Sequence, residues 1–155
     1  MTPHAELDAQ PTMQRQLILM RHGQAEELRD DFARRLTEQG RGAARRAGQA
    51  LCAARFSPQR ILTSSAPRAS ETAELVAVCC GYGGALQLDQ ALYLAEEGPY
   101  LSALRALPDA LSRVLLVGHN PTLSALGHKL GGAGSELRPA EYVELHLELT
   151  SWQDL

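Results

Sequence analysis

The sequence is poor in cysteine and has no long hydrophobic run. Only 3 of its 155 residues are cysteines, and Cys79 and Cys80 are adjacent, which makes a bridge between those two geometrically implausible. We expect all three cysteines to be buried thiols. The longest aliphatic runs, residues 17–20 and 114–117, are far shorter than the ~20 apolar residues that span a bilayer. The sequence therefore predicts neither a disulfide scaffold nor a transmembrane segment.

Aromatic residues and excess charge are also scarce. Aromatic side chains make up 5% of the chain, and 15 Lys and Arg against 18 Asp and Glu give a net charge of −3. This composition is typical of a globular protein and does not favour binding to nucleic acid. Residues 1–14 contain acids and two prolines but no apolar segment, so they do not resemble a secretory signal, and we expect a cytoplasmic protein.

The length of the chain suits one folded domain. A chain of this size buries roughly 70% of the surface that its unfolded form exposes, so it needs neither a metal nor a disulfide to fold. We expect a flexible N-terminal extension at residues 1–14 and a single domain at residues 15–155. Met13 directly precedes the first apolar run, which leaves translation from Met1 or from Met13 as alternatives.

Short apolar segments alternate with longer segments of helical pattern. This alternation predicts an α/β fold, a three-layer sandwich in which a mostly parallel sheet has helices on both faces. The last apolar segment alternates strictly between polar and apolar residues, which indicates a half-buried, antiparallel edge strand. The predicted strands are residues 16–20, 60–63, 86–88, 113–117 and 142–149. The predicted helices are residues 37–55 with Thr37 as the cap, 64 or 65 to 80, 99–107, and 120–130 with Asn120 as the cap and Pro121 as the first helical residue.

Two of these strands are followed within one or two residues by a histidine. His22 comes after Arg21 at the end of the first strand, and His119 follows the fourth strand. Arg68 lies in the first turn of the helix after the second strand, beside the positive end of the helix dipole. Because the carboxyl ends of parallel strands lie at one edge of a sheet, we expect these four side chains to meet in one pocket. Such a pocket favours an anion, and a phosphoryl group fits it best.

Three motifs occur at these strand ends in a fixed order. Residues 21–23 read Arg-His-Gly, residues 63–73 read TSSAPRASETA, and residues 118–120 read Gly-His-Asn. In these motifs the chain resembles the histidine phosphatase superfamily, the phosphoglycerate-mutase-like proteins, over almost its whole length from residue 16 onward. Its short length, the LTEQG segment at residues 36–40 and the lack of a large insertion are similar to the SixA branch, the bacterial phosphohistidine phosphatases.

The resemblance implies catalysis through a covalent phosphohistidine intermediate. His22 matches the nucleophile of the family, which attacks phosphorus. Arg21, Arg68 and His119 match the residues that hold the phosphoryl oxygens, where fixed positive charge stabilises the transition state. Further candidates for substrate binding are Gly23, Ser64 and Asn120.

Larger family members supply a general acid as a glutamate before the second histidine. Here the candidates are Glu96 and Glu97, and Glu141 is a further acid to consider. A site without such an acid would still cleave phosphohistidine, because imidazole leaves with a conjugate-acid pKa of ~6.5, against ~15.7 for an alkoxide-like leaving group. This difference favours phosphohistidine over a broad range of phosphomonoesters.

The resulting hypothesis is a metal-independent phosphatase without a cofactor, since two histidines without a third clustered ligand make a poor metal site. Its expected substrate is a phosphorylated protein such as a histidine phosphotransfer domain, with no nucleic acid and no membrane involved. Two alternatives remain open: a phosphomonoesterase for a small molecule, and a non-catalytic module that binds phosphate or a phosphoprotein.

Other polar residues have simpler interpretations. His4, His128 and His146 have no charged or catalytic company in the sequence, so we expect them in the tail, on a helix surface and on a sheet surface. The arginine-rich stretch at residues 34–46 is interpreted as a solvated helix face, with docking of an acidic partner as the alternative. Helix capping explains Ser64 as well as a contact with phosphate does.

Overall fold

The computed structural model describes residues 11–132 and 136–155, in which five strands form one sheet. The strands are β1 (Met13–Arg21), β2 (Arg60–Ser64), β3 (Gln87–Asp89), β4 (Arg113–Gly118) and β5 (Tyr142–Leu149). Their order across the sheet is β3-β2-β4-β1-β5, and every neighbouring pair is parallel except β1 with β5. The predicted sheet, mostly parallel with one antiparallel edge strand, is confirmed.

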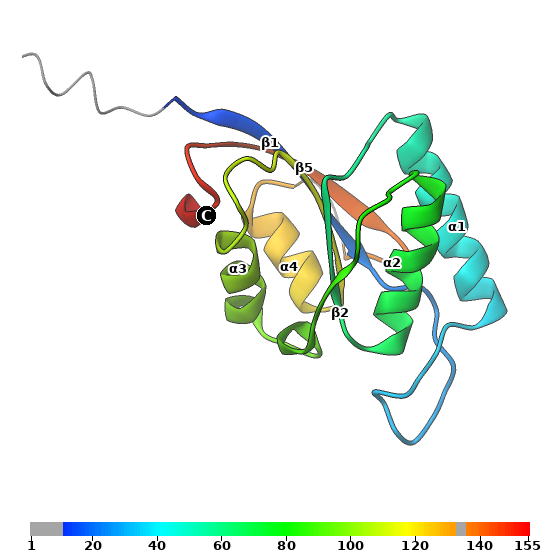
Figure 1. Cartoon of the computed structure of the whole chain (residues 1–155). Helices are drawn as coiled ribbons and strands as arrows, with labels where there is room; N and C mark the ends of the chain where they lie inside the picture. Colours follow the sequence, from blue (N-terminus) through cyan, green and yellow to red (C-terminus); the bar gives the residue numbers. More distant parts are fainter. Residues whose placement is uncertain (1–10, 133–135) are drawn as a thin grey trace, which may run out of the picture.

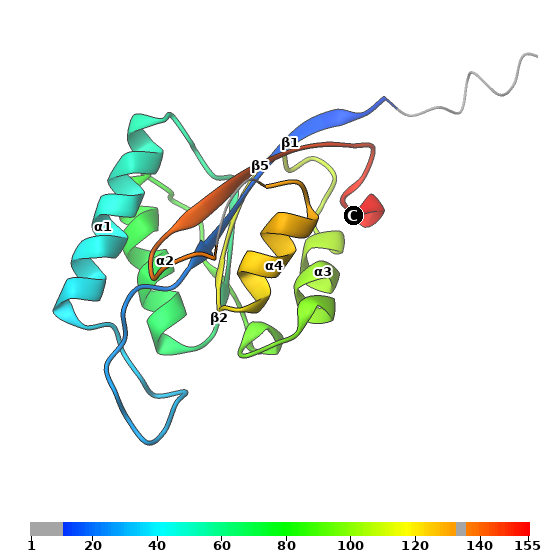
Figure 2. The same ribbon diagram turned by 180° about the vertical axis from the view of Figure 1, so that it is seen from behind.

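Helices cover both faces of the sheet and complete the three-layer sandwich. They are α1 (Glu38–Ala53), α2 (Pro67–Cys79), α3 (Glu97–Arg105) and α4 (Thr122–Lys129), with short 3-10 segments at Gln90–Leu92 and Trp152–Asp154. Helices α1 and α2 lie on one face and α3 and α4 on the other, as Figure 1 and Figure 2 show from opposite sides. In the described part of the chain, no helix is both long enough and apolar enough to cross a membrane.

Successive residues of β1 point to opposite faces of the sheet, and both faces are buried. Leu17 and Leu19 belong to the core beneath α3 and α4, whereas Ile18 and Met20 belong to the core beneath α1 and α2. All four side chains are fully buried. Burial on both faces explains why the central strands read as continuous apolar runs rather than as alternating patterns.

Two helix starts follow from local sequence. Thr37 caps α1 as predicted, because its Oγ1 accepts a hydrogen bond from the Gly40 N–H at 2.9 Å. Pro67 is the first residue of α2, where its missing N–H needs no partner. These caps fix where α1 and α2 begin, and α2 begins directly after the carboxyl end of β2.

The amino end of the sheet extends further than the sequence predicted. β1 begins at Met13, so residues 13 and 14 of the expected extension pair with β5. Residues 1–10 of that extension lie outside the described residues. Near the start of β1, Arg15 is only 1% exposed, and its guanidinium carbon lies 5.2 Å from the ring centroid of Trp152.

The three cysteines are less buried than predicted. Cys52 is exposed, and Cys79 and Cys80 are half-buried. Cys79 and Cys80 lie at the end of α2, where their sulfur atoms contact backbone carbonyl groups of α1. The prediction of buried thiols is wrong because this end of the helix pair reaches the surface.

Candidate active site

The carboxyl ends of β1 and β4 bring the two site histidines together. Arg21, the last residue of β1, lies opposite Gly118 in the parallel pair. The residues that follow, His22 and His119, therefore emerge side by side, with ring centroids 5.1 Å apart. Their exposed fractions are 9% and 3%, so both rings are shielded from water.

The His22 ring has one nitrogen engaged. Its Nδ1 lies 2.7 Å from the carbonyl oxygen of Gly23, which can only accept a hydrogen bond, so Nδ1 carries the proton and Nε2 the lone pair. Burial, together with the charges of Arg68 and Arg21, lowers the pKa of His22 to about 4, although the bond to Gly23 opposes this shift. At neutral pH the ring is therefore an uncharged imidazole, the protonation state that a nucleophilic histidine requires.

His119 is held through its ring and through its backbone. Its Nε2 lies 2.8 Å from Ser64 Oγ, and its backbone N–H donates to the Tyr100 hydroxyl oxygen at 3.0 Å. A Ser64 hydroxyl that donates to Nε2 leaves Nδ1 as an N–H donor. Burial, with the nearby His22 and Arg68, lowers the pKa of His119 to about 3. His119 is thus a neutral hydrogen-bonding group at neutral pH.

Three buried nitrogen atoms of the site residues have no hydrogen-bond partner among the described residues. They are Nε of Arg21, Nε of Arg68 and Nδ1 of His119. A buried donor without an acceptor costs about 1 to 3 kcal/mol, and phosphoryl oxygens are acceptors that would satisfy all three. Within residues 11–132 and 136–155, no group of three or more His, Cys, Asp or Glu side chains is placed to hold a metal ion. The donor set therefore fits an oxyanion.

A carboxylate that the sequence analysis missed also lies at this site. Asp31 Oδ2 accepts hydrogen bonds from Tyr93 Oη at 2.6 Å and from Arg68 Nη2 at 3.0 Å. Arg68 Nη1 donates to the Asp31 backbone oxygen at 2.7 Å. Hydrogen bonds from Tyr93, Arg34 and Arg68 lower the pKa of Asp31 to about 2, so the carboxylate is ionised at neutral pH. The Tyr93 ring in turn lies edge-on to His119, with centroids 5.7 Å apart.

Arg34 does not lie on a solvated helix face as the sequence analysis predicted. It precedes α1, its side chain is 24% exposed, and its Nη1 lies 3.1 Å from Asp31 Oδ1. Its positive charge contributes to the lowered pKa of His22. Arg45 and Arg46 are exposed on α1, as predicted. Arg35 precedes α1, and Arg41 is half-buried and forms an ion pair with Glu71, so the prediction of a solvated helix face holds for only part of the stretch.

Two glycines of the motifs are explained by packing. A Cβ atom on Gly23 would lie 2.8 Å from the Gly40 carbonyl oxygen, and a Cβ atom on Gly118 would lie 2.5 Å from the Tyr100 hydroxyl. The Gly23 N–H donates to Thr72 Oγ1 at 3.0 Å, which connects the segment after β1 to α2. These contacts account for both glycines without a bound substrate, so the role of Gly23 in substrate binding stays a prediction.

The side chain of Asn120 is engaged within the protein. Its Nδ2 donates to the Leu137 carbonyl at 2.8 Å, and its Oδ1 accepts from the Ser124 N–H at 3.1 Å. The prediction that Asn120 caps α4 with Pro121 as the first helical residue is wrong, because α4 begins at Thr122 and Pro121 occupies the cap position. Asn120 therefore connects the start of α4 to the loop before β5, and contact with substrate stays a prediction.

The candidate general acids line other cavities. Glu96 and Glu97 belong to a cavity of about 210 Å³ whose remaining lining residues are Pro121, Thr122 and Ala125. Glu97 also forms an ion pair with Lys129 of α4. In the described part of the chain, neither glutamate forms a hydrogen bond or an ion pair with a site histidine or arginine. The acid that does so is Asp31.

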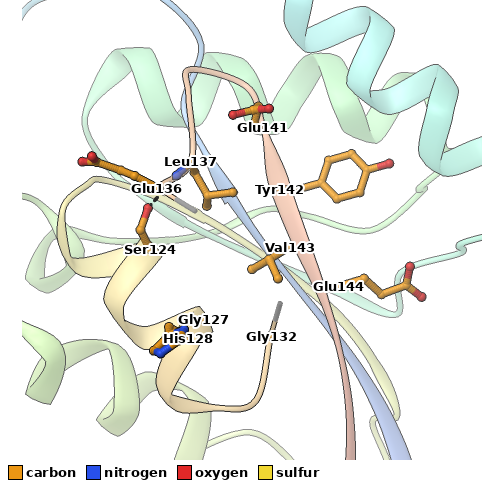
Figure 3. A pocket seen from close by; sticks show the side chains of 10 residues that line it. All are labelled: Ser124, Gly127, His128, Gly132, Glu136, Leu137, Glu141, Tyr142, Val143 and Glu144. Atoms are coloured by element: carbon orange, nitrogen blue, oxygen red, sulfur yellow. Dashed lines mark hydrogen bonds between the residues drawn. The ribbon is translucent and has the colours of Figure 1, made fainter. Parts of the chain in front are cut away.

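A further cavity, of about 330 Å³, lies between α4 and β5 (Figure 3). Glu136, Glu141 and Glu144 line it, and Glu141 Oε1 accepts from the Arg138 N–H at 2.6 Å. The residues that line this cavity do not include the two site histidines, Arg21 or Arg68. The Glu141 side chain therefore accepts a hydrogen bond from the Arg138 backbone and lines a cavity that neither site histidine lines.

Comparisons with known proteins match both the fold and the motifs. The sequence profile of the histidine phosphatase superfamily, branch 1, matches residues 17–93, which include His22 and Arg68. The solved structure of a candidate phosphohistidine phosphatase SixA from Nakamurella multipartitia is 28% identical, covers 93% of this chain and 90% of that chain, and has a TM-score of 0.79. A candidate phosphohistidine phosphatase SixA from Agrobacterium tumefaciens is 30% identical over 77% of each chain, with a TM-score of 0.68.

A third solved structure has a similar fold. It is that of the protein histidine phosphatase SixA in complex with tungstate, which is 23% identical, covers 86% of this chain and 93% of that chain, and has a TM-score of 0.77. Together the fold and these matches define a hydrolase of the phosphatase class. Within this class, the chain belongs to the histidine phosphatase superfamily.

Proposed function

We propose that this protein removes the phosphoryl group from phosphohistidine in another protein, with His22 as the nucleophile. The observation that carries the proposal is the neutral His22 ring, whose Nδ1 is held by Gly23, next to three buried donors that have no partner within residues 11–132 and 136–155. The similarity to structures named as SixA phosphohistidine phosphatases supports the choice of substrate. The proposed partner is a phosphorylated protein, such as one with a histidine phosphotransfer domain, in the cytoplasm.

The proposed reaction has two steps. In the first, Nε2 of His22 attacks phosphorus, a new N–P bond forms, and the N–P bond of the substrate breaks as its imidazole leaves. In the second, a water oxygen attacks phosphorus and forms a new O–P bond, and the bond between phosphorus and His22 Nε2 breaks. Inorganic phosphate leaves, Nε2 regains its lone pair, and the water gives up a proton to solvent or to the phosphate. Arg21, Arg68 and His119 hold the phosphoryl oxygens in both steps, where charge develops. Ser64 acts through His119, which it holds at 2.8 Å.

The acid at the site favours phosphohistidine over an alkyl phosphate. Asp31 is ionised and bound to Arg68 and Tyr93, so it has no proton to give to a leaving group at neutral pH. An imidazole leaves with a conjugate-acid pKa of ~6.5 and needs little help, whereas an alkoxide needs a general acid. A small-molecule phosphomonoesterase would require such an acid.

The test is hydrolysis of a phosphohistidine protein and of an alkyl phosphate, with EDTA present. The native protein should prefer the phosphohistidine protein, and His22→Ala should lose at least about 1000-fold in kcat/KM. His128→Ala is the matched control, because His128 is an exposed histidine on α4 and should leave the rate unchanged. Quenching the native reaction with alkaline detergent should trap a phosphoryl group on His22, because the N–P bond of phosphohistidine is stable in base and labile in acid.

Three outcomes would contradict the proposal. Preference for the alkyl phosphate would make the protein a metabolite phosphatase with the same nucleophile. Activity that survives in His22→Ala would overturn the nucleophile. Binding of phosphate without turnover of either substrate would indicate a non-catalytic binding module.

A further inference from the structure

The guanidinium of Arg68 is buried and already carries an anionic partner. The Arg68 side chain is 3% exposed, and both of its Nη atoms bind Asp31, one at the carboxylate and one at the backbone oxygen. Its Nε remains without a partner among the described residues. A buried charge needs a counter-charge, and in this structure that counter-charge comes from the protein itself.

Asp31 is itself held by several donors yet reaches solvent. Tyr93, Arg34 and Arg68 come from three different segments and all donate to its carboxylate. The carboxylate lies in the segment between β1 and α1, and its side chain is 43% exposed. The Asp31 side chain therefore reaches solvent, while its Oδ2 accepts a hydrogen bond from Arg68.

We propose that Asp31 is a positioning residue that serves as the resident counter-charge of the phosphoryl site. It orients Arg68 through both Nη atoms, and its negative charge lowers the affinity of the pocket for free phosphate. The inference rests on the proposed phosphoryl site. A phosphatase of this kind must release inorganic phosphate in every cycle, and a fixed carboxylate beside the phosphate-binding arginine weakens product binding by electrostatic repulsion.

Two substitutions of Asp31 separate the effect of its negative charge from the effect of its hydrogen bonds to Arg68. Asp31→Asn keeps an oxygen that can accept from Arg68 and Tyr93 but removes the negative charge. Asp31→Ala removes both the charge and the side-chain acceptor, and leaves Arg68 with the backbone oxygen alone. Asp30→Asn is the matched control, because Asp30 is the neighbouring exposed carboxylate with no side-chain hydrogen bond recorded in the described part of the chain.

The probe is inorganic phosphate, measured by titration calorimetry and as a product inhibitor. Asp31→Asn should bind phosphate about five- to tenfold more tightly than the native protein, the effect expected from one partly exposed charge at close range. Asp31→Asn should retain more kcat for the phosphohistidine protein than Asp31→Ala does, because the bonds that orient Arg68 are kept. Asp31→Ala should lose at least about tenfold in kcat, and Asp30→Asn should match the native protein in both measurements.

Equal or weaker phosphate binding by Asp31→Asn would overturn the counter-charge role. Full kcat in Asp31→Ala would overturn the positioning role. Neither result bears on the proposed function, which is decided by the activity of His22→Ala and by the choice between the two substrates. Thermal unfolding of both Asp31 variants shows whether a change in kcat reflects loss of fold instead.

Discussion

Two buried arginines lie at opposite ends of the sheet and differ in what neutralises them. Arg15, at the amino end of β1, donates to the backbone oxygens of Asp109, Leu111 and Thr150 at 2.7, 2.8 and 3.2 Å. Arg68, at the carboxyl end of β2, binds the carboxylate and backbone oxygen of Asp31. The hydrogen bonds of Arg15 thus go to main-chain dipoles, whereas Arg68 also donates to a full negative charge that reaches solvent.

The comparison also shows which signals identify a ligand site. In the part of the chain that the structure describes, Nε has no hydrogen-bond partner in Arg15 as well as in Arg68, so one such nitrogen does not by itself mark an anion site. What distinguishes the carboxyl end is the gathering of three orphaned donors, from Arg21, Arg68 and His119, beside two neutral histidines. We therefore expect Arg15, at the amino end, to affect stability and the residues at the carboxyl end to carry the proposed chemistry.

The largest effect should come from Arg68→Lys. Lysine keeps the charge but loses the planar fork, so we expect kcat/KM to fall about 100- to 1000-fold, equivalent to about 3 to 4 kcal/mol of transition-state stabilisation. Steady-state kinetics with the phosphohistidine protein measures this loss, and urea unfolding should show a smaller change in stability than Arg15→Met does. Native-like activity in Arg68→Lys would contradict the expectation that Arg68 supports catalysis whereas Arg15 supports stability.

The next effect should be on stability and come from Arg15→Met. Three backbone oxygens lose their donors and Trp152 loses its cationic neighbour, so the free energy of unfolding should fall by about 2 to 3 kcal/mol. Urea unfolding measures the loss, while kcat of the folded protein should stay unchanged. The control Arg45→Met removes an exposed arginine on α1 and should change stability by less than about 0.5 kcal/mol. A loss of kcat with intact stability would contradict this assignment.

The smallest effect should be a loss of stability at mildly acidic pH, caused by the two buried histidines at the carboxyl end of the sheet. The pKa values of His22 and His119 are lowered from 6.5 to about 4 and about 3, so the unfolded chain binds protons first as the pH falls below about 6.5. The free energy of unfolding therefore declines as the pH falls through about 6.5, by about 1.6 kcal/mol for the two histidines together between pH 7.5 and pH 6.

Unfolding in urea at the two pH values measures this slope. His22→Ala should reduce the slope, and His128→Ala should not. The acid limb of kcat/KM should appear near pH 4, where His22 gains a proton in the folded protein. A flat stability profile between pH 7.5 and pH 6 would contradict the burial of two neutral histidines.

The sequence predicted the features that depend on local pattern. The apolar runs gave the sheet and its parallel order, because both faces of the central strands are buried. His22 and His119 could be placed together because each follows such a run and parallel strands end at one edge. Tertiary contacts outside these patterns moved element boundaries, as at Met13, where pairing with β5 lengthens the first strand.

The residues that support the site could not be predicted in the same way. Asp31 lies in a polar loop and Tyr93 after a short 3-10 segment, and no periodicity links them to Arg68. Tyr100 reads as one apolar residue of a helix, yet its hydroxyl accepts from the His119 N–H and its ring explains why residue 118 is glycine. These roles come from packing between layers, which a single sequence does not encode in any local spacing.

The place of β1 in the sheet has a consequence for how the protein assembles. β1 pairs with β4 and β5, the two strands that come last along the chain. Within the described residues it pairs with neither β2 nor β3. During synthesis the segment with His22 therefore leaves the ribosome long before either of its partners exists. Contacts between segments so distant in sequence form slowly. His22, the proposed nucleophile, is synthesised early, but the strands that flank its segment are completed only when β5 has been added.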